Sequence, residues 1–404
     1  MIGGGASGLM AAGVAGARGK KVLLLEKNKK VGEKLRITGG GRCNITNNTL
    51  DLRTLLARYG DAEQALYSSY SQFGVKGTFE FFESLDLPLK TEANNRTFPQ
   101  SENALDVVKV LEKYCKENGV TILTNTPVEK IITESALVTK IVTKGGAYTA
   151  KSIILATGGI SHPETGSTGD GFKFLKDLGH TIASPTPSIV PIAVNDLWVK
   201  SLAGVTAQSI KINFFALGKK QFSKSGSLLF THFGLSGHLI LNCAKDIADL
   251  FYLGAVTGTI DLFPKKDFNI VEAELIGLFD SNKNKIFKNA LKEFVPPGMP
   301  SGLLTLMPSV LAEKKVHSIT KEERKTMIHL LKALPFTVEG LMGFDKAVVA
   351  DGGVLINEID MRTMQSKKYK NLYVTGDLLH ITRPSGGYSL QLCWTTGYVA
   401  GINS

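Results

Sequence analysis

Residues 1–26 read MIGGGASGLMAAGVAGARGKKVLLLE, and this stretch decides the fold. Gly3 to Gly8 match the spacing G-x-G-x-x-G, a small-residue helical pattern follows, and a short apolar run ends at Glu26. In such a motif the first glycine makes a tight turn, the second lets backbone approach a pyrophosphate, and the third lets the helix pack on the strand. The helix N-terminus then offers free N–H groups to the phosphates. The stretch therefore predicts a dinucleotide-binding β-turn-α-β unit.

Glu26 narrows the choice of dinucleotide. It follows Gly8 by 18 residues, close to the place where an acid accepts hydrogen bonds from ribose hydroxyls. An acid there favours an unphosphorylated ribose, and hence FAD or NAD over NADP. Only Met1 and Ile2 precede the glycines, so we expect the first strand of the sheet to be very short.

Composition excludes several classes of protein. The 404 residues are 43% hydrophobic and 21% charged, which excludes disorder and collagen-like repeats and predicts two or three globular domains. The cysteines Cys43, Cys115, Cys243 and Cys393 lie far apart without a C-x-x-C pair. This spacing argues against a disulfide framework or a structural zinc site and favours a reducing compartment.

The net charge of +11 favours anionic ligands. Because the basic residues are scattered in short clusters, we expect an anionic cofactor and a small-molecule substrate, and regard nucleic acid as an unlikely partner. No apolar run reaches the roughly 18 residues needed to span a bilayer, and the first residues lack the positive start of a signal peptide. We expect a cytoplasmic protein without a membrane partner; the oligomeric state stays open.

Two further glycine segments belong to the same prediction. Residues 39–41 are three glycines followed by Arg42 and Asn44, a loop that can lie flat against a large planar ligand. Residues 386–391, GGYSLQ, open a helical pattern whose small residues permit close packing on a sheet. The N–H groups at its start can stabilise the negative charge that develops at N1–C2=O when a flavin accepts hydride. An ordinary buried C-terminal helix would show the same pattern.

Other motifs carry a resemblance to a known family. They are ATGG (156–159), STGDG (167–171), FTHFGLSG (230–237), GGV (352–354), TMQSK (363–367) and the segments LYVTGD, GGYSLQ and TGYVAG between 372 and 401. With GGGASG (3–8) and KLRITGGGRCNITN (34–47), they resemble the BaiN/aminoacetone-oxidase family of bacterial FAD-dependent flavoproteins. The motifs extend from one end of the chain to the other.

The resemblance implies a fold and a domain plan. The expected fold is α/β, with a Rossmann-type, glutathione-reductase-like FAD-binding domain, an inserted antiparallel β-barrel-like domain and a small helical domain. The FAD-binding domain would comprise 1–184 and 348–404, the β-rich domain 185–264 and 335–347, and the helical domain 265–334. The residue patterns agree, because residues 209–214 alternate as in a half-buried strand and residues 272–279, 284–294 and 321–334 read as helices.

The resemblance also implies which residues hold FAD. Glu26 would bind the adenosine ribose, the backbone of Val128 would meet adenine, and Asp377 would bind the ribityl chain and phosphates. The full set that we expect to contact FAD is Gly3, Gly5, Ala6, Ser7, Gly8, Glu26, Lys27, Thr38, Gly40, Arg42, Cys43, Asn44, Val128, Ala156, Thr157, Gly158, Gly376, Asp377, Gly386, Gly387, Tyr388, Ser389 and Leu390.

Candidate catalytic residues come from polar positions near these motifs. Histidine is the residue most easily poised for proton transfer near neutral pH, and His162, His232 and His380 are the candidates. Arg383 is a candidate clamp for a substrate carboxylate. Each is also readily explained as an ordinary surface or structural residue. Cys43 is expected to pack against the cofactor rather than react.

The predicted activity is that of an FAD-dependent oxidoreductase that transfers hydride between flavin N5 and a small organic substrate, with NAD(P)H as a reductant that docks transiently. No second G-x-G-x-x-G marks a nicotinamide domain. The resemblance leaves two directions open, a reductive one on steroid-like or conjugated carbonyl substrates and an oxidative one on amines with release of hydrogen peroxide. A tRNA-modifying flavoprotein and a non-catalytic flavin-holding scaffold are also compatible with the sequence. No metal is expected.

Overall fold

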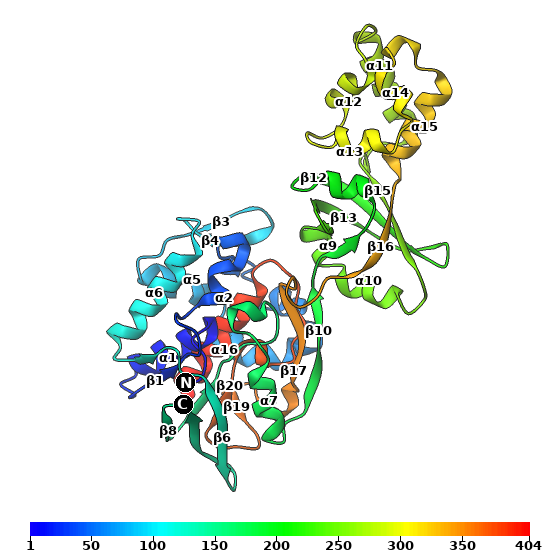
Figure 1. The fold of residues 1–404 in the computed structure, drawn as a ribbon. Coiled ribbons are helices and arrows are strands. Elements are labelled where there is room, and N and C mark those ends of the chain that lie inside the picture. The colour runs from blue at the N-terminus through cyan, green and yellow to red at the C-terminus, as the bar shows by residue number, and fades with distance from the viewer. The chain divides into compact units, whose positions relative to one another are not determined.

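The computed structural model describes residues 1–404, and the chain forms two compact units (Figure 1). The discontinuous unit contains Met1–Pro187 and Val348–Ser404, and the inserted unit contains Ser188–Ala347. Each unit is described by itself below. None of the helices combines the length and the apolar character that a membrane crossing requires.

A parallel sheet lies at the centre of the discontinuous unit. Its parallel strands are β1 (Leu23–Leu25), β5 (Thr121–Leu123), β9 (Ile153–Leu155) and β20 (Leu372–Val374). Ile2 forms parallel bridges to Leu25 on one side and Leu155 on the other, and thereby joins the two pairs of strands. The expected short first strand is thus reduced to one bridging residue. The antiparallel β18 (Ile359–Asp360) and β19 (Gln365–Ser366) continue the sheet beyond β20.

Two helices opened by glycines pack against each other beside this sheet. Helix α1 (Ala6–Ala17) and helix α16 (Tyr388–Asn403) are buried along most of their length. A Cβ atom placed on Gly397 would lie 2.5 Å from the carbonyl oxygen of Ser7, and one on Gly401 would lie 2.7 Å from that of Ala11. The two glycines are therefore required where the helix backbones touch.

Smaller elements surround the sheet of the discontinuous unit. The helices are α2 (Glu33–Ile37), α3 (Leu52–Leu56), α4 (Glu63–Gln72), α5 (Val75–Ser84), α6 (Ala104–Glu117) and α7 (Asp170–Asp177). The antiparallel strands are β2 (Thr46–Asn47), β3 (Leu89–Thr91), β4 (Arg96–Pro99), β6 (Val128–Glu134), β7 (Leu137–Thr143) and β8 (Gly146–Tyr148). Strands β10 (Ile182–Ile189) and β17 (Val349–Val354) pair with each other where the chain leaves and re-enters this unit.

The inserted unit is built on a closed barrel. In order around the barrel its strands are β11 (Ile192–Val194), β14 (Gly234–Ser236), β13 (Lys219–Thr231), β12 (Thr206–Ala216), β15 (Val256–Asp261) and β16 (Leu334–Leu341). Ile210, Ile212 and Phe214 alternate into the interior, as the sequence pattern predicts for residues 209–214. Closure removes free sheet edges, which would otherwise invite pairing with other chains.

Helices complete the inserted unit. They are α8 (Leu197–Ser201), α9 (His238–Leu241), α10 (Ala244–Leu250), α11 (Phe268–Ser281), α12 (Phe287–Phe294), α13 (Pro300–Thr305), α14 (Ser309–Glu313) and α15 (Lys321–Lys332). The barrel and α11 to α15 share one hydrophobic core. Helix α15 begins with a capping box in which Thr320 and Glu323 satisfy each other's backbone N–H groups. The architecture confirms the predicted fold class of a Rossmann-type domain with an inserted barrel and helices.

Candidate functional site

The first glycine turn leaves space in front of α1. Gly8 has no room for a side chain, because its Cβ would lie 2.0 Å from the carbonyl oxygen of Gly3. Gly5 behaves differently, since nothing lies within 4 Å of a Cβ placed on it. The first turn of a helix has N–H groups without an intrahelical partner, and these open toward that space. A pyrophosphate can therefore approach the backbone at Gly5.

Helices α1 and α16 run side by side in the same direction, and α16 begins further toward the shared N-terminal end. Gly397 faces Ser7, and Gly401 faces Ala11, so α1 and α16 run parallel. Helix α16 begins at Tyr388, nine residues before Gly397, whereas α1 begins one residue before Ser7. At 1.5 Å per residue, the start of α16 lies about 12 Å beyond the start of α1. Two positive helix ends thus line one side of the unit, separated by a span suited to an extended dinucleotide.

Contacts with the strand β2 region hold the start of α16. A Cβ on Gly387 would lie 2.3 Å from the carbonyl carbon of Thr46, and Gly387 has a φ of +103°, so only glycine is accommodated here. In the orientation that satisfies its whole amide, the Asn44 side chain accepts the N–H of Gly387 at 3.0 Å and donates to the backbone of Thr46 and Thr97. The predicted loop at 39–44 and the predicted turn at 386–387 therefore meet.

Glu26 lies buried beside the first glycine turn. Its carboxylate accepts the N–H of Gly4 at 2.7 Å and that of Asn28 at 2.8 Å. The Asn28 side chain donates in turn to the carbonyl of Thr165 at 3.0 Å. Free lone pairs remain on the Glu26 oxygens, so the carboxylate is oriented and able to accept ribose hydroxyls.

A cluster of largely buried charged side chains lies next to the first turn of α16. The Arg383 guanidinium, whose side chain is 1% exposed, forms an ion pair with Asp377, and Lys34 approaches the other oxygen of Asp377 at 3.2 Å. Arg383 also donates to Ser389 Oγ at 3.1 Å and to the Ile381 carbonyl. Burial alone would raise the pKa of Asp377, but Arg383 and Lys34 outweigh it and lower that pKa.

This cluster gives Arg383 a different setting from the one expected. Three of the five guanidinium N–H groups of Arg383 donate to Ser389, Ile381 and Asp377, so the arginine fixes Asp377 against the first turn of α16. Its role as a clamp for a substrate carboxylate stays a prediction. Lys34, which the sequence reasoning did not single out, belongs to the same cluster; its place in the KLRITGGG motif was the only signal.

The loop at 38–44 combines three glycines in left-handed conformations with a buried cysteine. Gly39, Gly40 and Gly41 all have positive φ, and a Cβ on Gly40 or Gly41 would meet nothing within 4 Å. Cys43 is fully buried, and burial raises the pKa of its thiol to about 12, so it is not a reactive thiolate. Packing of Cys43 against the cofactor stays a prediction.

Two basic residues of the predicted set have protein partners. Arg42 pairs with Glu92 and Glu102 and lies over the Phe98 ring at 4.1 Å, rather than pointing its charge at free space. Lys27 pairs with Asp170 at 2.7 Å. Both charges are thereby compensated within the protein, so contact with FAD would have to come through their backbone or by exchange of partners.

The candidate histidines lie in different places. His162 adopts a positive φ in the loop that includes Thr165, and Nδ1 lies 2.8 Å from the Glu164 carboxylate. This loop contacts Asn28, so His162 lies at the Glu26 end of the site. His380 follows the Gly376–Leu378 turn on the α16 side, and its buried Nδ1 has no hydrogen-bond partner. His232 lies in the exposed turn between β13 and β14 of the inserted unit.

These features fit a flavin dinucleotide. Gly5 and Gly40 leave open space in front of the backbone, and the buried Nδ1 of His380 is a polar atom that a ligand would satisfy. Apart from His232, all the predicted cofactor and catalytic residues belong to the discontinuous unit. Their contacts with FAD stay predictions.

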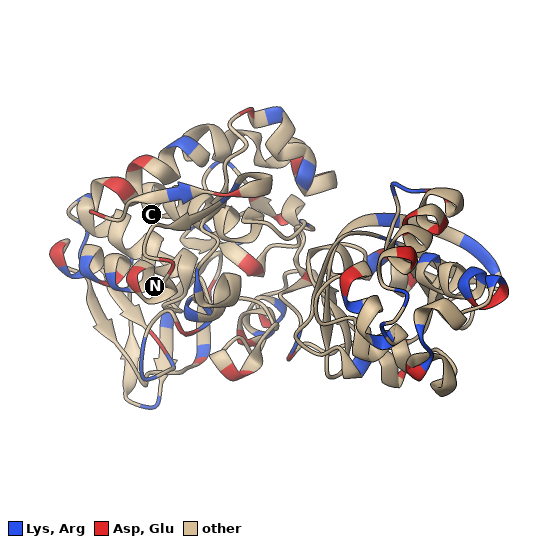
Figure 2. Ribbon diagram, turned by 90° about the horizontal axis from the view of Figure 1, so that it is seen from above, with Lys and Arg blue, Asp and Glu red and all other residues tan.

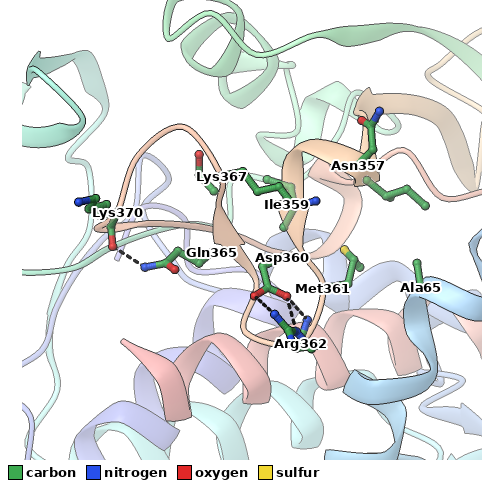
Figure 3. A pocket seen from close by; sticks show the side chains of 11 residues that line it. Ala65, Asn357, Ile359, Asp360, Met361, Arg362, Gln365, Lys367 and Lys370 are labelled. Carbon is green, nitrogen blue, oxygen red and sulfur yellow. Dashed lines mark hydrogen bonds and ion pairs between the residues drawn. The ribbon is translucent and has the colours of Figure 1, made fainter.

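A separate cavity of about 700 Å³ opens at the β18–β19 hairpin (Figure 3). Ile359, Met361 and Ala65 contribute apolar surface, whereas Arg362 is held by the Asp360 carboxylate and the Gln365 amide by the Lys370 carbonyl. None of the residues predicted to bind FAD lines this cavity. It is therefore not the site described above.

A buried histidine network near this cavity was missed by sequence reasoning. His180 Nδ1 lies 2.7 Å from Glu358, and Nε2 lies 2.9 Å from Ser366 Oγ, a geometry that resembles a hydrolytic triad. However, Ser366 Oγ also accepts the N–H groups of Lys368 and Tyr369 at 3.1 Å each. With its lone pairs engaged, the hydroxyl is a poor nucleophile, so the network fastens β19 to the chain at His180.

This network predicts a loss of stability in acid. Burial lowers the pKa of His180; burial would raise that of Glu358, but hydrogen bonds from Thr181, His180 and Lys368 outweigh it and lower the pKa to about 2. In both cases the unfolded chain binds the proton more readily. The stabilisation that each residue contributes is therefore fully present above its unfolded pKa and is lost as the pH falls. The His180 contribution declines below about pH 6.5 and the Glu358 contribution between about pH 4.5 and 2.

Denaturant unfolding followed by Trp394 fluorescence in a Trp198→Phe background reports on the discontinuous unit alone, because the inserted unit holds the other tryptophan. We expect Glu358→Gln to lower the unfolding free energy by about 2 kcal/mol at pH 7 and to lack the part of the acid-induced loss between about pH 4.5 and 2 that Glu358 causes. Glu129→Gln, at an exposed site of the same unit, is the control. Equal pH profiles for Glu358→Gln and the unmodified protein would contradict the assignment.

Comparisons with known proteins agree with this geometry. The family model described as the HI0933-like protein Rossmann domain matches residues 1–403. The chain is 31% identical to a 3-dehydro-bile acid delta(4,6)-reductase of Clostridium scindens, over 99% of this chain and 97% of the relative. It is 27% identical to a ribosomal RNA dihydrouridine synthase of Haemophilus influenzae, over 100% and 97%. The second relative leaves open our expectation that nucleic acid is an unlikely partner.

Among solved structures, a 3-ketosteroid delta1-dehydrogenase from Sterolibacterium denitrificans matches 99% of this chain and 98% of its own length, with a TM-score of 0.55 at 14% identity. At that identity the likeness establishes the fold. The expected resemblance and the expected cofactor, FAD, are confirmed by the family match. The chain belongs to the HI0933-like Rossmann-domain family and is an FAD-dependent oxidoreductase.

Proposed function

We propose that this protein is a reductase that saturates a carbon–carbon double bond conjugated to a carbonyl group, with NAD(P)H as its reductant. The proposal rests on the names of two relatives. The names of both relatives describe reductions, of a delta(4,6)-unsaturated 3-dehydro bile acid in one case and of uridine to dihydrouridine in the other. The reductive direction is therefore favoured over amine oxidation.

The chain supplies binding and electrostatics for this reaction. Bound FAD would supply hydride transfer at its N5 atom. The N–H groups at Gly5 and the first turn of α1 would bind the pyrophosphate, and Glu26 would accept the adenosine ribose hydroxyls. The first N–H groups of α16, from Tyr388 onward, would lower the energy of negative charge on the ring system.

Saturating a double bond requires a proton as well as a hydride, and His380 is our candidate donor. Its Nδ1 is buried without a partner in the segment that joins the Gly376–Leu378 turn to α16. His162 is less suited, because its loop lies at the Glu26 end of the site. General acid catalysis of this kind contributes roughly 100- to 10,000-fold.

His380→Ala is expected to slow oxidation of the reduced enzyme by an unsaturated substrate about 100-fold or more. Its reduction by NADH or NADPH should change little, because that half-reaction needs no proton from His380. Stopped-flow absorbance of the flavin band separates the two half-reactions, with His162→Ala as the matched control. Equal slowing by both variants, or none by His380→Ala, would rule out the assigned proton donor.

The proposed function is tested by following reduction of the flavin in the absence of oxygen. The FAD-loaded protein is mixed with NADH, NADPH or a panel of amines, and bleaching of the visible flavin band is followed. We expect bleaching by a nicotinamide and recovery of colour on adding a 4-ene-3-ketosteroid. Bleaching by an amine alone would indicate the oxidase instead, and no bleaching by any donor would indicate a flavin-holding scaffold.

A uracil base in ribosomal RNA is the second candidate substrate. It is favoured by the 27% identical relative and by the net charge of +11, which draws the protein to polyanions. A uridine-rich RNA replaces the ketosteroid in the same assay. Recovery of colour by RNA with formation of dihydrouridine would select this candidate, whereas recovery by the steroid alone would select the small-molecule reductase.

A further inference from the structure

Two loops at one end of the barrel expose large apolar side chains. Leu217 follows β12 and is 72% exposed, while Phe251, Tyr252 and Leu253 follow α10 and are 36%, 90% and 46% exposed. Most large apolar residues of the chain are buried, so a run of this kind marks an interaction site. We refer to Leu217 and residues 251–253 as the Tyr252 patch.

The two loops are neighbours in space. Ala216, the last residue of β12, pairs with Val256, the first residue of β15. The residues just beyond these strand ends therefore lie side by side, and a Cβ on Gly254 would lie 3.8 Å from Leu217 Cδ2. The Tyr252 patch is thus one continuous surface within the inserted unit.

Uncompensated positive charge borders the patch. Ala216 also pairs with Lys219 in the β12–β13 hairpin, which places Lys219 and Lys220 directly after Leu217 and Gly218. Both lysines are exposed, and neither forms an ion pair. Lys and Arg are otherwise interspersed with Asp and Glu along both units, as Figure 2 shows, and the aromatic surface beside Lys219 and Lys220 distinguishes them from the exposed pair Lys20 and Lys21.

The acidic residues nearby in the chain do not cancel this charge. Asp246 of α10 is held by Lys224 at 3.6 Å, which leaves Asp249 as the exposed carboxylate that precedes the patch in α10. Lys219, Lys220 and Asp249 together leave the border of the patch positive. Attraction of a phosphate backbone follows from that sign.

We propose that the Tyr252 patch binds single-stranded RNA, with bases stacked on Tyr252 and phosphates paired with Lys219 and Lys220. The proposal rests on the second candidate function, RNA as the substrate. Exposed aromatic rings beside lysines on a barrel are the combination that holds single strands, because every base has a face that can stack. Leu217 and Leu253 would extend the apolar surface around the stacked base.

The test measures binding of the FAD-loaded protein to a fluorescein-labelled oligouridine of about 12 nucleotides, by anisotropy over a series of salt concentrations. Tyr252→Ala should weaken binding about 10-fold or more. The double variant K219A/K220A should weaken it similarly and reduce the slope of log K against log salt by about 1.4. Tyr252 is almost fully exposed, so its loss should leave the fold unchanged.

Matched controls separate the patch from general effects. Tyr67→Ala removes a 53% exposed tyrosine of the discontinuous unit, and K20A/K21A removes two adjacent exposed lysines there. Both controls should bind RNA as the unmodified protein does. NADH reduction of the flavin should be equal in all variants, because none of these residues belongs to the proposed cofactor site.

The outcomes distinguish this surface from the reaction it would serve. RNA binding that falls only in the patch variants supports the surface, even if no dihydrouridine forms, in which case the RNA-reductase function fails alone. Equal binding by Tyr252→Ala and the unmodified protein overturns the surface. So does patch-dependent association with vesicles of phosphatidylcholine and phosphatidylglycerol, or patch-dependent dimerisation, in a protein that does not bind the RNA.

Discussion

Gly5→Val is expected to weaken FAD binding at least 100-fold while leaving the fold intact. The backbone at Gly5 is extended, with φ −82° and ψ −166°, and nothing lies within 4 Å of an added Cβ, so the protein itself accommodates valine. The loss arises because the valine methyl groups would occupy the space that the pyrophosphate needs. A 100-fold change corresponds to about 2.7 kcal/mol of binding free energy.

Fluorescence titration of the FAD-free protein measures the dissociation constant, and circular dichroism measures the thermal midpoint. Gly340→Val is the control, because Gly340 also has open space and lies in an extended strand of the inserted unit. Both variants should melt close to the unmodified protein, and the Gly340 variant should retain its FAD affinity. Tight FAD binding by Gly5→Val would show that the pyrophosphate lies elsewhere.

Arg383→Met is expected to lower the unfolding free energy of the discontinuous unit by about 3 kcal/mol. The substitution leaves the Asp377 carboxylate with Lys34 as its remaining cation, and removing one partner from a buried ion-pair cluster is costly. It also raises the pKa of Asp377, because Arg383 is the strongest of the groups that lower it. The stabilisation that Asp377 provides above its unfolded pKa is therefore lost, and unfolding at pH 7 becomes easier.

Urea unfolding followed by Trp394 fluorescence in the Trp198→Phe background measures this effect. Arg362→Met is the matched control, because Arg362 forms an exposed ion pair with Asp360. The control should leave the midpoint unchanged. If Arg383→Met were equally harmless, Arg383 would not hold Asp377 in place, and a role as a substrate clamp would be favoured.

Much of the fold could be predicted because it depends on local backbone requirements. The spacing of the glycines alone predicts the turn at Gly3 to Gly8 and the helix that follows, and the structure contains both. The alternation at 209–214 likewise predicts a barrel strand. Ile2 completes the sheet through hydrogen bonds to strands more than 20 and 150 residues away, which no local pattern reveals.

The partners of charged side chains were harder to predict. Arg42 and Arg383 both follow recognisable motifs, yet their ion pairs join residues 50 and 6 positions away in the chain through tertiary packing. His180 meets Glu358 and Ser366 across more than 170 residues. In each case the sequence reveals a charge, and only the fold reveals what compensates it.

We propose that one FAD binds between the N-termini of α1 and α16. The most direct test is a crystal structure of the FAD-loaded protein. We expect pyrophosphate oxygens within hydrogen-bond distance of the Ala6 and Ser7 N–H groups, and the flavin pyrimidine edge within the same distance of the first N–H groups of α16. A flavin ring bound away from Tyr388, with only one helix end touching the cofactor, would contradict the claim.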